Sequence, residues 1–170
     1  IWDLSAAPKA PIILKGHEGY VWKLAELNDG RLASGSWDKT IRIWDLSGDA
    51  APIIVPHGDA VRGMLALQDG RLATGGGKDG MINVWNVDSQ SCTKALELAS
   101  HPKYVAALAE LPGGRLAAGG GDAGRRGEGF HIRIFDLNDG PHQAPKVLRG
   151  RADVWSLVTL DDGRLAAGGP

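Results

Sequence analysis

Five histidines are the residues of this sequence that could bind a metal ion or act as a base: His17, His57, His101, His131 and His142. Imidazoles bind zinc when several ligands converge at short spacings. The first three instead recur 40 and 44 residues apart, each ahead of a run that contains Val and then Leu or Met. That recurrence indicates a repeated structural position. The other two have no ligand cluster near them in the sequence, so we expect no metal site.

Two glycine-rich stretches, residues 75–80 and 119–124, match the G-x-G-x-x-G pattern of dinucleotide-binding loops. That chemistry requires a strand before the loop and a helix after it. Here a strand is expected to follow within a few residues, which favours turn glycines, and we expect no cofactor. The single cysteine, Cys92, has no neighbouring histidine or basic residue to activate it. It cannot form an intramolecular disulfide, and it fits a reducing compartment.

These residues belong to an internal repeat, which predicts the fold. The segment Arg-Leu-Ala begins at residues 31, 71, 115 and 164, three times directly after Asp-Gly. An aromatic phrase recurs at 1–4 (IWDL), 43–46 (IWDL), 84–87 (VWNV) and 134–137 (IFDL). Four diverged units with spacings of 40 to 50 residues have the period of propeller blades with four strands each.

Each unit contains four short segments with the alternation of β-strands. In the first complete unit these are residues 20–27, 31–36, 40–46 and 52–56. No stretch of useful length has a helical period. We therefore predict an all-β propeller that occupies residues 1–170 as a single domain or half-propeller. Its blades are expected at about 20–56, 60–98, 104–149, and 154–168 together with 1–15.

The recurring Gly-His, Asp-Gly-Arg-Leu-Ala and Ile-Trp-Asp segments, in fixed order, resemble the WD-repeat family over essentially the whole chain. In that family a buried hydrogen-bonded set joins the histidine, a turn aspartate, a strand hydroxyl and a tryptophan. The resemblance implies two such sets here: His17, Ser34, Asp38 and Trp44, and His57, Thr74, Asp79 and Trp85. An Asp-His-Ser combination could also be a catalytic triad. Its recurrence beside a buried Trp favours a structural clamp.

The third and fourth units depart from this pattern. The third has Ala118 in the hydroxyl position and Phe135 in the tryptophan position, and the fourth has Arg151 in the histidine position and Ala167 in the hydroxyl position. Neither unit can form the hydrogen-bonded set. We expect their blades to be held by apolar packing and to be less stable than the first two.

The two ends of the sequence carry complementary parts of one unit, since IWDL closes the motif that RLAAGG opens. We expect the last blade to be completed by the N-terminal strands of the same chain or of a partner, which hides strand edges. A four-blade ring must turn by about 90° per blade, and no bulky residues wedge these blades apart. This favours a homodimeric eight-bladed ring, with a four-bladed monomer and a fragment of a longer ring as alternatives. The closure residues would be Ile1, Trp2, Leu4 and Leu165.

Partner-binding candidates lie in the connections between strands, where propellers carry variable residues. An insertion at 119–131 contains two arginines and two acidic residues that could grip an acidic peptide or a phosphate. A mobile loop that tolerates length is the alternative, and the first reading requires that alanine at Arg125 and Arg126 weaken partner binding. Exposed aromatic residues are expected near the same face. The candidates are Tyr20, Trp37, Tyr104, Asp122, Arg125, Arg126, Glu128 and Arg151.

The formal net charge is −1, which does not indicate a nucleic acid or membrane partner. No apolar run is long enough for a membrane span and no signal segment is visible, so we expect a cytoplasmic protein. The function predicted is a non-catalytic scaffold that binds protein or peptide partners through loops on one face. The alternative is a self-assembling fragment, or an engineered half-propeller, that forms the homodimeric ring and has no other activity.

Overall fold

The computed structural model of the protein describes residues 1–4, 10–48, 50–99, 103–121, 131–140, 144–150 and 153–170. In this part of the chain the secondary structure consists of strands. The same residues contain no helix that is long and apolar enough to cross a bilayer. The prediction of an all-β fold is confirmed.

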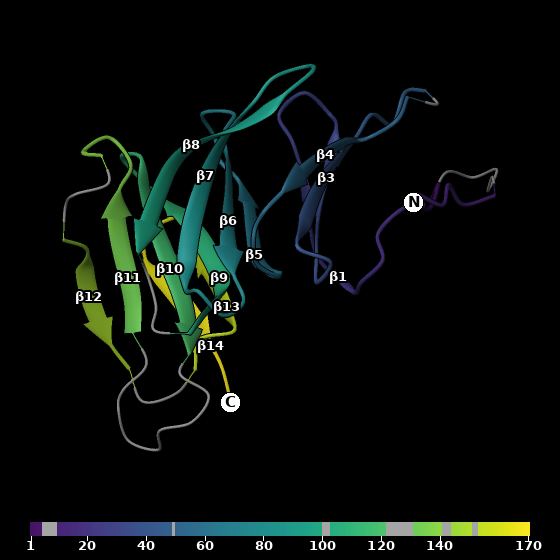
Figure 1. Ribbon diagram of the computed structural model, residues 1–170. Helices are drawn as coiled ribbons and strands as arrows, with labels where there is room; N and C mark the ends of the chain where they lie inside the picture. The colour runs from purple at the N-terminus through teal and green to yellow at the C-terminus, as the bar shows by residue number, and fades with distance from the viewer. Residues whose placement is uncertain (5–9, 49, 100–102, 122–130, 141–143, 151–152) are drawn as a thin grey trace.

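The strands form three antiparallel sheets of four strands and one of two, each in sequence order (Figure 1). The first sheet contains β1 (Val21–Glu26), β2 (Leu32–Ser36), β3 (Thr40–Trp44) and β4 (Ile53–Pro56). The second contains β5 (Val61–Ala66), β6 (Leu72–Gly76), β7 (Met81–Val87) and β8 (Cys92–Ala99). The third contains β9 (Tyr104–Leu111), β10 (Arg115–Gly121), β11 (His131–Asp136) and β12 (Lys146–Arg149). The fourth contains β13 (Ser156–Thr159) and β14 (Leu165–Gly168).

Tight Asp-Gly turns set the register between the first two strands of a sheet. In the β1–β2 turn, Gly30 has a φ of 83°, a conformation that costs little only for glycine. Asp29 accepts hydrogen bonds from the backbone N (3.1 Å) and Nε (2.8 Å) of Arg31. The same aspartate-to-arginine bonds recur at 69–71 and 162–164. Because the turn fixes the pairing, the apolar side chains of each strand face the neighbouring sheets.

The hydrophobic core lies between the sheets rather than within any one of them. The first strands of successive sheets, β1, β5, β9 and β13, contact one another in order. Between the first two sheets the core includes Ile41, Ile43, Val61, Met64 and Leu72. Between the second and third it includes Ile82, Val84, Val105, Leu108 and Leu116. Each sheet is therefore stabilised by the apolar face of the next one along the arc.

The two-stranded sheet is not completed by the N-terminal residues of the same chain. Ile1 instead exchanges backbone hydrogen bonds with Ile12, over 2.6 and 3.0 Å. In Figure 1 the N-terminus lies on the side of the first sheet, apart from β14. Trp2 and Leu4 are 76% and 93% exposed, and Leu165 is half-buried within the two-stranded sheet. Of the two expected forms of closure, closure within one chain is thus not found in the described residues.

Candidate partner-binding surface

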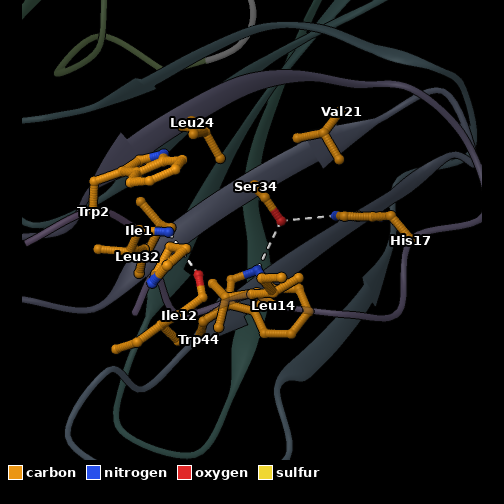
Figure 2. Close-up of a pocket in the computed structure, with 12 residues that line it drawn as sticks. Ile1, Trp2, Ile12, Leu14, His17, Val21, Leu24, Leu32, Ser34 and Trp44 are labelled. Carbon is orange, nitrogen blue, oxygen red and sulfur yellow. Dashed lines mark hydrogen bonds between the residues drawn. The ribbon is translucent and has the colours of Figure 1, made fainter. Parts of the chain in front are cut away.

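A hydrogen-bonded set centred on the Ser34 hydroxyl joins the segment before β1 to two strands of the first sheet. The His17 ring nitrogens lie 2.7 Å from Ser34 Oγ (Nε2) and 2.7 Å from Asp38 Oδ2 (Nδ1). Trp44 Nε1 donates to Ser34 Oγ over 2.8 Å, as Figure 2 shows. Since the carboxylate can only accept, His17 Nδ1 carries the proton and Nε2 accepts from the serine. The set ties the segment before β1 to β2 and β3.

Burial raises the pKa of Asp38, but hydrogen bonds outweigh it. They come from the Thr40 side chain, the His17 ring, and the backbone N–H groups of Glu18 and Thr40. The net effect is a pKa well below the usual range, because each of these donors favours the charged carboxylate. The loop between β2 and β3 is therefore held by an ionised group at neutral pH.

The second sheet contains a related set with one different member. His57 Nε2 lies 3.0 Å from Thr74 Oγ1, and Trp85 Nε1 donates to the same oxygen over 2.8 Å. His57 Nδ1 donates to the backbone carbonyl of Asp59 over 2.8 Å, in the place where Asp79 was expected. The Asp79 carboxylate instead accepts from the backbone N of Met81 over 2.9 Å. The Asp59 side chain takes over the fixing of the loop, because it accepts from the backbone N–H groups of residues 78 and 79.

These sets cannot act as catalytic triads at their hydroxyls. Ser34 is 3% exposed and Thr74 is fully buried, so neither oxygen is accessible to a substrate. Each hydroxyl oxygen also accepts an indole N–H, which occupies a lone pair that a nucleophile would need. Burial raises the pKa of the Cys92 thiol to about 11, so it stays protonated at neutral pH.

The burial of His57 predicts a pH dependence of stability. Burial lowers its pKa, against the smaller opposing effect of its hydrogen bond to Asp59. The folded state keeps the ring neutral, whereas the unfolded chain takes up a proton below about pH 6.5. The unfolded state then binds more protons, so stability falls as the pH falls, by up to about 1.4 kcal/mol per pH unit.

Urea unfolding of the wild type and of His57→Gln between about pH 7.5 and about pH 5 measures this contribution. The variant should be less stable at neutral pH, and its stability should fall less steeply as the pH is lowered from about 6.5. Equal pH slopes for the two proteins would show that His57 is not held neutral in the folded state.

Above these sets, three exposed aromatic rings and one arginine form a continuous surface. Tyr20 and Trp37 have ring centroids 5.8 Å apart, and Trp22 and Trp37 have centroids 5.6 Å apart. The Arg62 guanidinium lies 4.5 Å from the centroid of the Trp22 ring. The rings of Tyr20, Trp37 and Trp22 belong to residues that are 69%, 46% and 40% exposed. We call Tyr20, Trp22, Trp37 and Arg62 the aromatic–arginine surface.

Backbone contacts fix this surface. Trp37 lies in the turn between β2 and β3, and its backbone N donates to the Tyr20 carbonyl over 2.9 Å. A Cβ atom on Gly19 would lie 2.7 Å from the backbone N of Asp38, so only glycine allows this approach of the two loops. The rings are thus held in place by the segments that also carry His17 and Asp38.

Comparison with models of protein families identifies two of the repeats. The family model for the WD domain, G-beta repeat, matches residues 9–45 and 51–86. The two matches contain the two hydrogen-bonded sets described above. The chain belongs to the WD-repeat family.

Curated WD-repeat relatives support the same assignment. An F-box/WD-40 repeat-containing protein of Arabidopsis thaliana is 30% identical over 166 residues, which cover 93% of this chain and 30% of that protein. The periodic tryptophan protein 2 homolog of Schizosaccharomyces pombe is 39% identical over 88 residues, or 49% of this chain and 10% of that protein. The chain therefore spans from about a tenth to less than a third of the length of these relatives.

Among solved structures, the crystal structure of the WD40 β-propeller domain of Doa1 resembles this chain with a TM-score of 0.74 and 21% identity. The match covers 92% of this chain and 50% of that chain. The predicted WD-type propeller fold is confirmed by this likeness, and each four-stranded sheet of the present chain is a propeller blade.

One of the expected surface aromatics is buried in the WD-repeat structure. Tyr104 is 7% exposed, because the Arg62 guanidinium lies 5.1 Å from its ring centroid and its hydroxyl donates to Asp153 Oδ2 over 2.7 Å. It therefore joins the third sheet to the fourth rather than facing a partner. Burial, and then the hydrogen bond to Asp153, raise the pKa of this phenol.

Five other candidates lie outside the residues that the structure describes: Asp122, Arg125, Arg126, Glu128 and Arg151. The described part of the chain contains no group of three or more His, Cys, Asp or Glu residues arranged to hold a metal ion.

Trp22 and Arg62 were not among the predicted site residues, although the sequence contains a signal for both. Each directly follows a valine at an equivalent position, Val21 in the first WD repeat and Val61 in the second. Because strand residues alternate between two faces and Val61 is buried, Arg62 points away from the core, and Trp22 occupies the same position in the first repeat. Aligning the repeats on these valines would have placed both side chains on the surface that carries Tyr20.

Proposed function

We propose that the chain is a non-catalytic scaffold that binds a protein or peptide segment at the aromatic–arginine surface. The observation that carries the proposal is the pair of exposed rings of Tyr20 and Trp37, whose centroids lie 5.8 Å apart and whose loops are joined by a backbone hydrogen bond. Tyrosine, tryptophan and arginine are the residues that most often supply binding energy in protein interfaces. A preformed surface also loses little conformational entropy when a partner binds.

The chemistry of the surface favours a segment with a basic side chain. Arg62 already covers the ring of Trp22, which leaves the rings of Tyr20 and Trp37 available to a partner. Beside these two rings lies a shallow depression that is also lined by Glu18 and Asp38. A Lys or Arg side chain there would gain a cation–π contact and the attraction of two carboxylates.

Selection of binders from a phage-displayed library of random peptides tests the proposal. Selected peptides should be enriched in Lys or Arg next to an apolar residue. Trp37→Ala should weaken their binding about tenfold or more, as expected for an aromatic anchor. The matched control is Ile54→Ala, which removes an apolar side chain that is 53% exposed on β4.

The control variant should bind the selected peptides like the wild type. Peptides that bind Trp37→Ala as tightly as the wild type, or that are weakened equally by Ile54→Ala, would contradict the proposed surface.

A further inference from the structure

Arg62 lies between aromatic rings that belong to the sheets on either side of its own. Its guanidinium carbon, Cζ, is 4.5 Å from the centroid of the Trp22 ring on β1 and 5.1 Å from that of Tyr104 on β9. A Cβ atom on Gly77, in the β6–β7 turn, would lie 3.5 Å from Arg62 Nε. Contacts with three successive sheets therefore hold this side chain in place.

The charge of Arg62 is not neutralised within the part of the chain that the structure describes. The ion pairs found there involve other residues. The Asp153 carboxylate, on the far side of Tyr104, accepts from the phenol over 2.7 Å and forms no ion pair with Arg62. None of the Arg62 nitrogens is a buried atom without a partner, so its N–H donors are open to solvent. A partner can therefore reach an unpaired positive charge.

The aromatic–arginine surface separates charges of opposite sign. Glu18 and Asp38 line the depression beside Trp37, and the low pKa of Asp38 keeps that carboxylate ionised at neutral pH. Arg62 lies in the opposite direction, beyond the ring of Trp22. The surface is thus negative at one end, apolar in the middle and positive at the other end.

The distance between the two charged ends limits the spacing of charges in a partner. The ring centroids of Trp37 and Trp22 lie 5.6 Å apart, and Arg62 Cζ lies 4.5 Å from the second of them. Arg62 is therefore no more than about 10 Å from the Trp37 ring, a distance that about three residues of extended chain span. A peptide whose basic side chain contacts Trp37 brings the residue two or three positions away next to Arg62.

We propose that the bound segment carries an aspartate or glutamate two or three residues from its basic residue, and that this carboxylate pairs with Arg62. The proposal rests on the binding surface proposed above and adds the order of charges in the partner. A guanidinium binds a carboxylate through two parallel N–H···O bonds, which fix orientation as well as add affinity. Complementary charges at both ends would also select one direction of the peptide.

The charges of the surface favour a carboxylate over a phosphate. A phosphate carries nearly two negative charges at neutral pH, whereas a carboxylate carries one. Glu18 and Asp38 lie at the other end of the same surface, and their repulsion grows with the charge of the bound group. A singly charged group therefore pairs with Arg62 at the smaller electrostatic cost.

Peptides selected from the random library on the wild-type protein provide the first test. Aspartate or glutamate should be enriched two or three positions from the basic residue, relative to the unselected library. A synthetic copy of one selected peptide is then compared, by fluorescence polarisation, with a counterpart in which the acid is replaced by its amide. The wild type should bind the acidic peptide about tenfold more tightly, as expected for hydrogen bonds to a charged group.

Arg62→Gln should bind the acidic peptide and its amide counterpart equally, because the variant lacks the charge that distinguishes them. The matched control is Lys146→Gln, which makes the same change in net charge at an exposed side chain on β12 and should keep the wild-type preference. If Arg62→Gln does not fold, Arg62→Lys replaces it. Lysine keeps the charge but lacks the two parallel donors, so the preference should be smaller than that of the wild type.

The outcomes separate this proposal from the binding surface on which it rests. No acidic enrichment, or a variant at Arg62 that keeps the full preference, overturns the pairing with Arg62. The surface itself still stands in that case if Trp37→Ala weakens binding. Peptides that bind without Trp37, or a library that yields no binder, overturn both. A phosphoserine counterpart that binds more tightly than the acidic peptide through Arg62 overturns the choice of a carboxylate.

Discussion

Replacing Gly75 by valine should lower the free energy of unfolding by about 3 kcal/mol or more. A Cβ atom at this position would lie 2.6 Å from Cβ of Val105 and 2.8 Å from its backbone O. A rotamer change cannot relieve contact with a backbone atom, so the second and third sheets must move apart. Because single domains are stable by only about 5–15 kcal/mol, such a loss is a large part of the total.

Urea unfolding followed by circular dichroism measures the effect. Gly48→Val is the matched control, because a Cβ atom on Gly48 meets nothing within 4 Å. The control should stay within about 0.5 kcal/mol of the wild type. If Gly75→Val were as stable as the control, the contact of Val105 with Gly75 would not determine how these two sheets fit together.

Thr74→Val should cost about 2–4 kcal/mol through the loss of one oxygen atom. The Thr74 hydroxyl accepts from Trp85 Nε1 over 2.8 Å and donates to His57 Nε2, which lies 3.0 Å away. Both partners are buried, so water does not replace the lost bonds. Valine has nearly the same shape as threonine, and the measured loss therefore reports the hydrogen bonds rather than a cavity.

The same chemical change at an exposed site provides the control. Thr93 lies exposed on β8, and Thr93→Val should alter the urea midpoint little or raise it slightly, since valine is favoured in strands. If both substitutions had equal effects, the buried set around His57 would contribute nothing beyond strand propensity.

The strands and the repeated sets were largely predictable because they depend on local patterns. Alternating residues in 20–27 gave β1, and the spacing of His17, Ser34 and Trp44 within one repeat corresponds to the bonds that the structure has. A strand pair and its turn lie within one repeat, so residues that are close in the sequence determine how the strands pair. The resemblance to WD repeats indicated which side chains would be hydrogen-bonded to one another.

The exchange of Asp79 for Asp59 was not predictable from the repeat alone. Asp79 lies in the β6–β7 turn and Asp59 in the β4–β5 connection, and His57 donates to the backbone carbonyl of Asp59 rather than to a carboxylate. The outcome depends on the loop amides of residues 78 and 79, which the Asp59 carboxylate binds. Backbone donors are present at every position and carry no sequence signature.

Burial of Tyr104 depends on contacts between sheets, which a pattern within one repeat does not report. Its ring is covered by Arg62 of the second sheet, and its hydroxyl is bound by Asp153, which precedes β13. The valines and glycines that meet where two sheets join, Val105 and Gly75 among them, did recur at constant positions in the sequence. Their pairing became evident only when neighbouring sheets were seen together.

Hydrogen–deuterium exchange of the chain, with and without a peptide selected from the random library, tests the central claim most directly. Binding at the aromatic–arginine surface should protect backbone amides in residues 17–22 and 36–40, the segments that carry Tyr20 and Trp37. The outer strands β4 and β8 should exchange as in the free protein. Protection confined to those outer strands, with none around Trp37, would contradict the claim that this surface is the binding site.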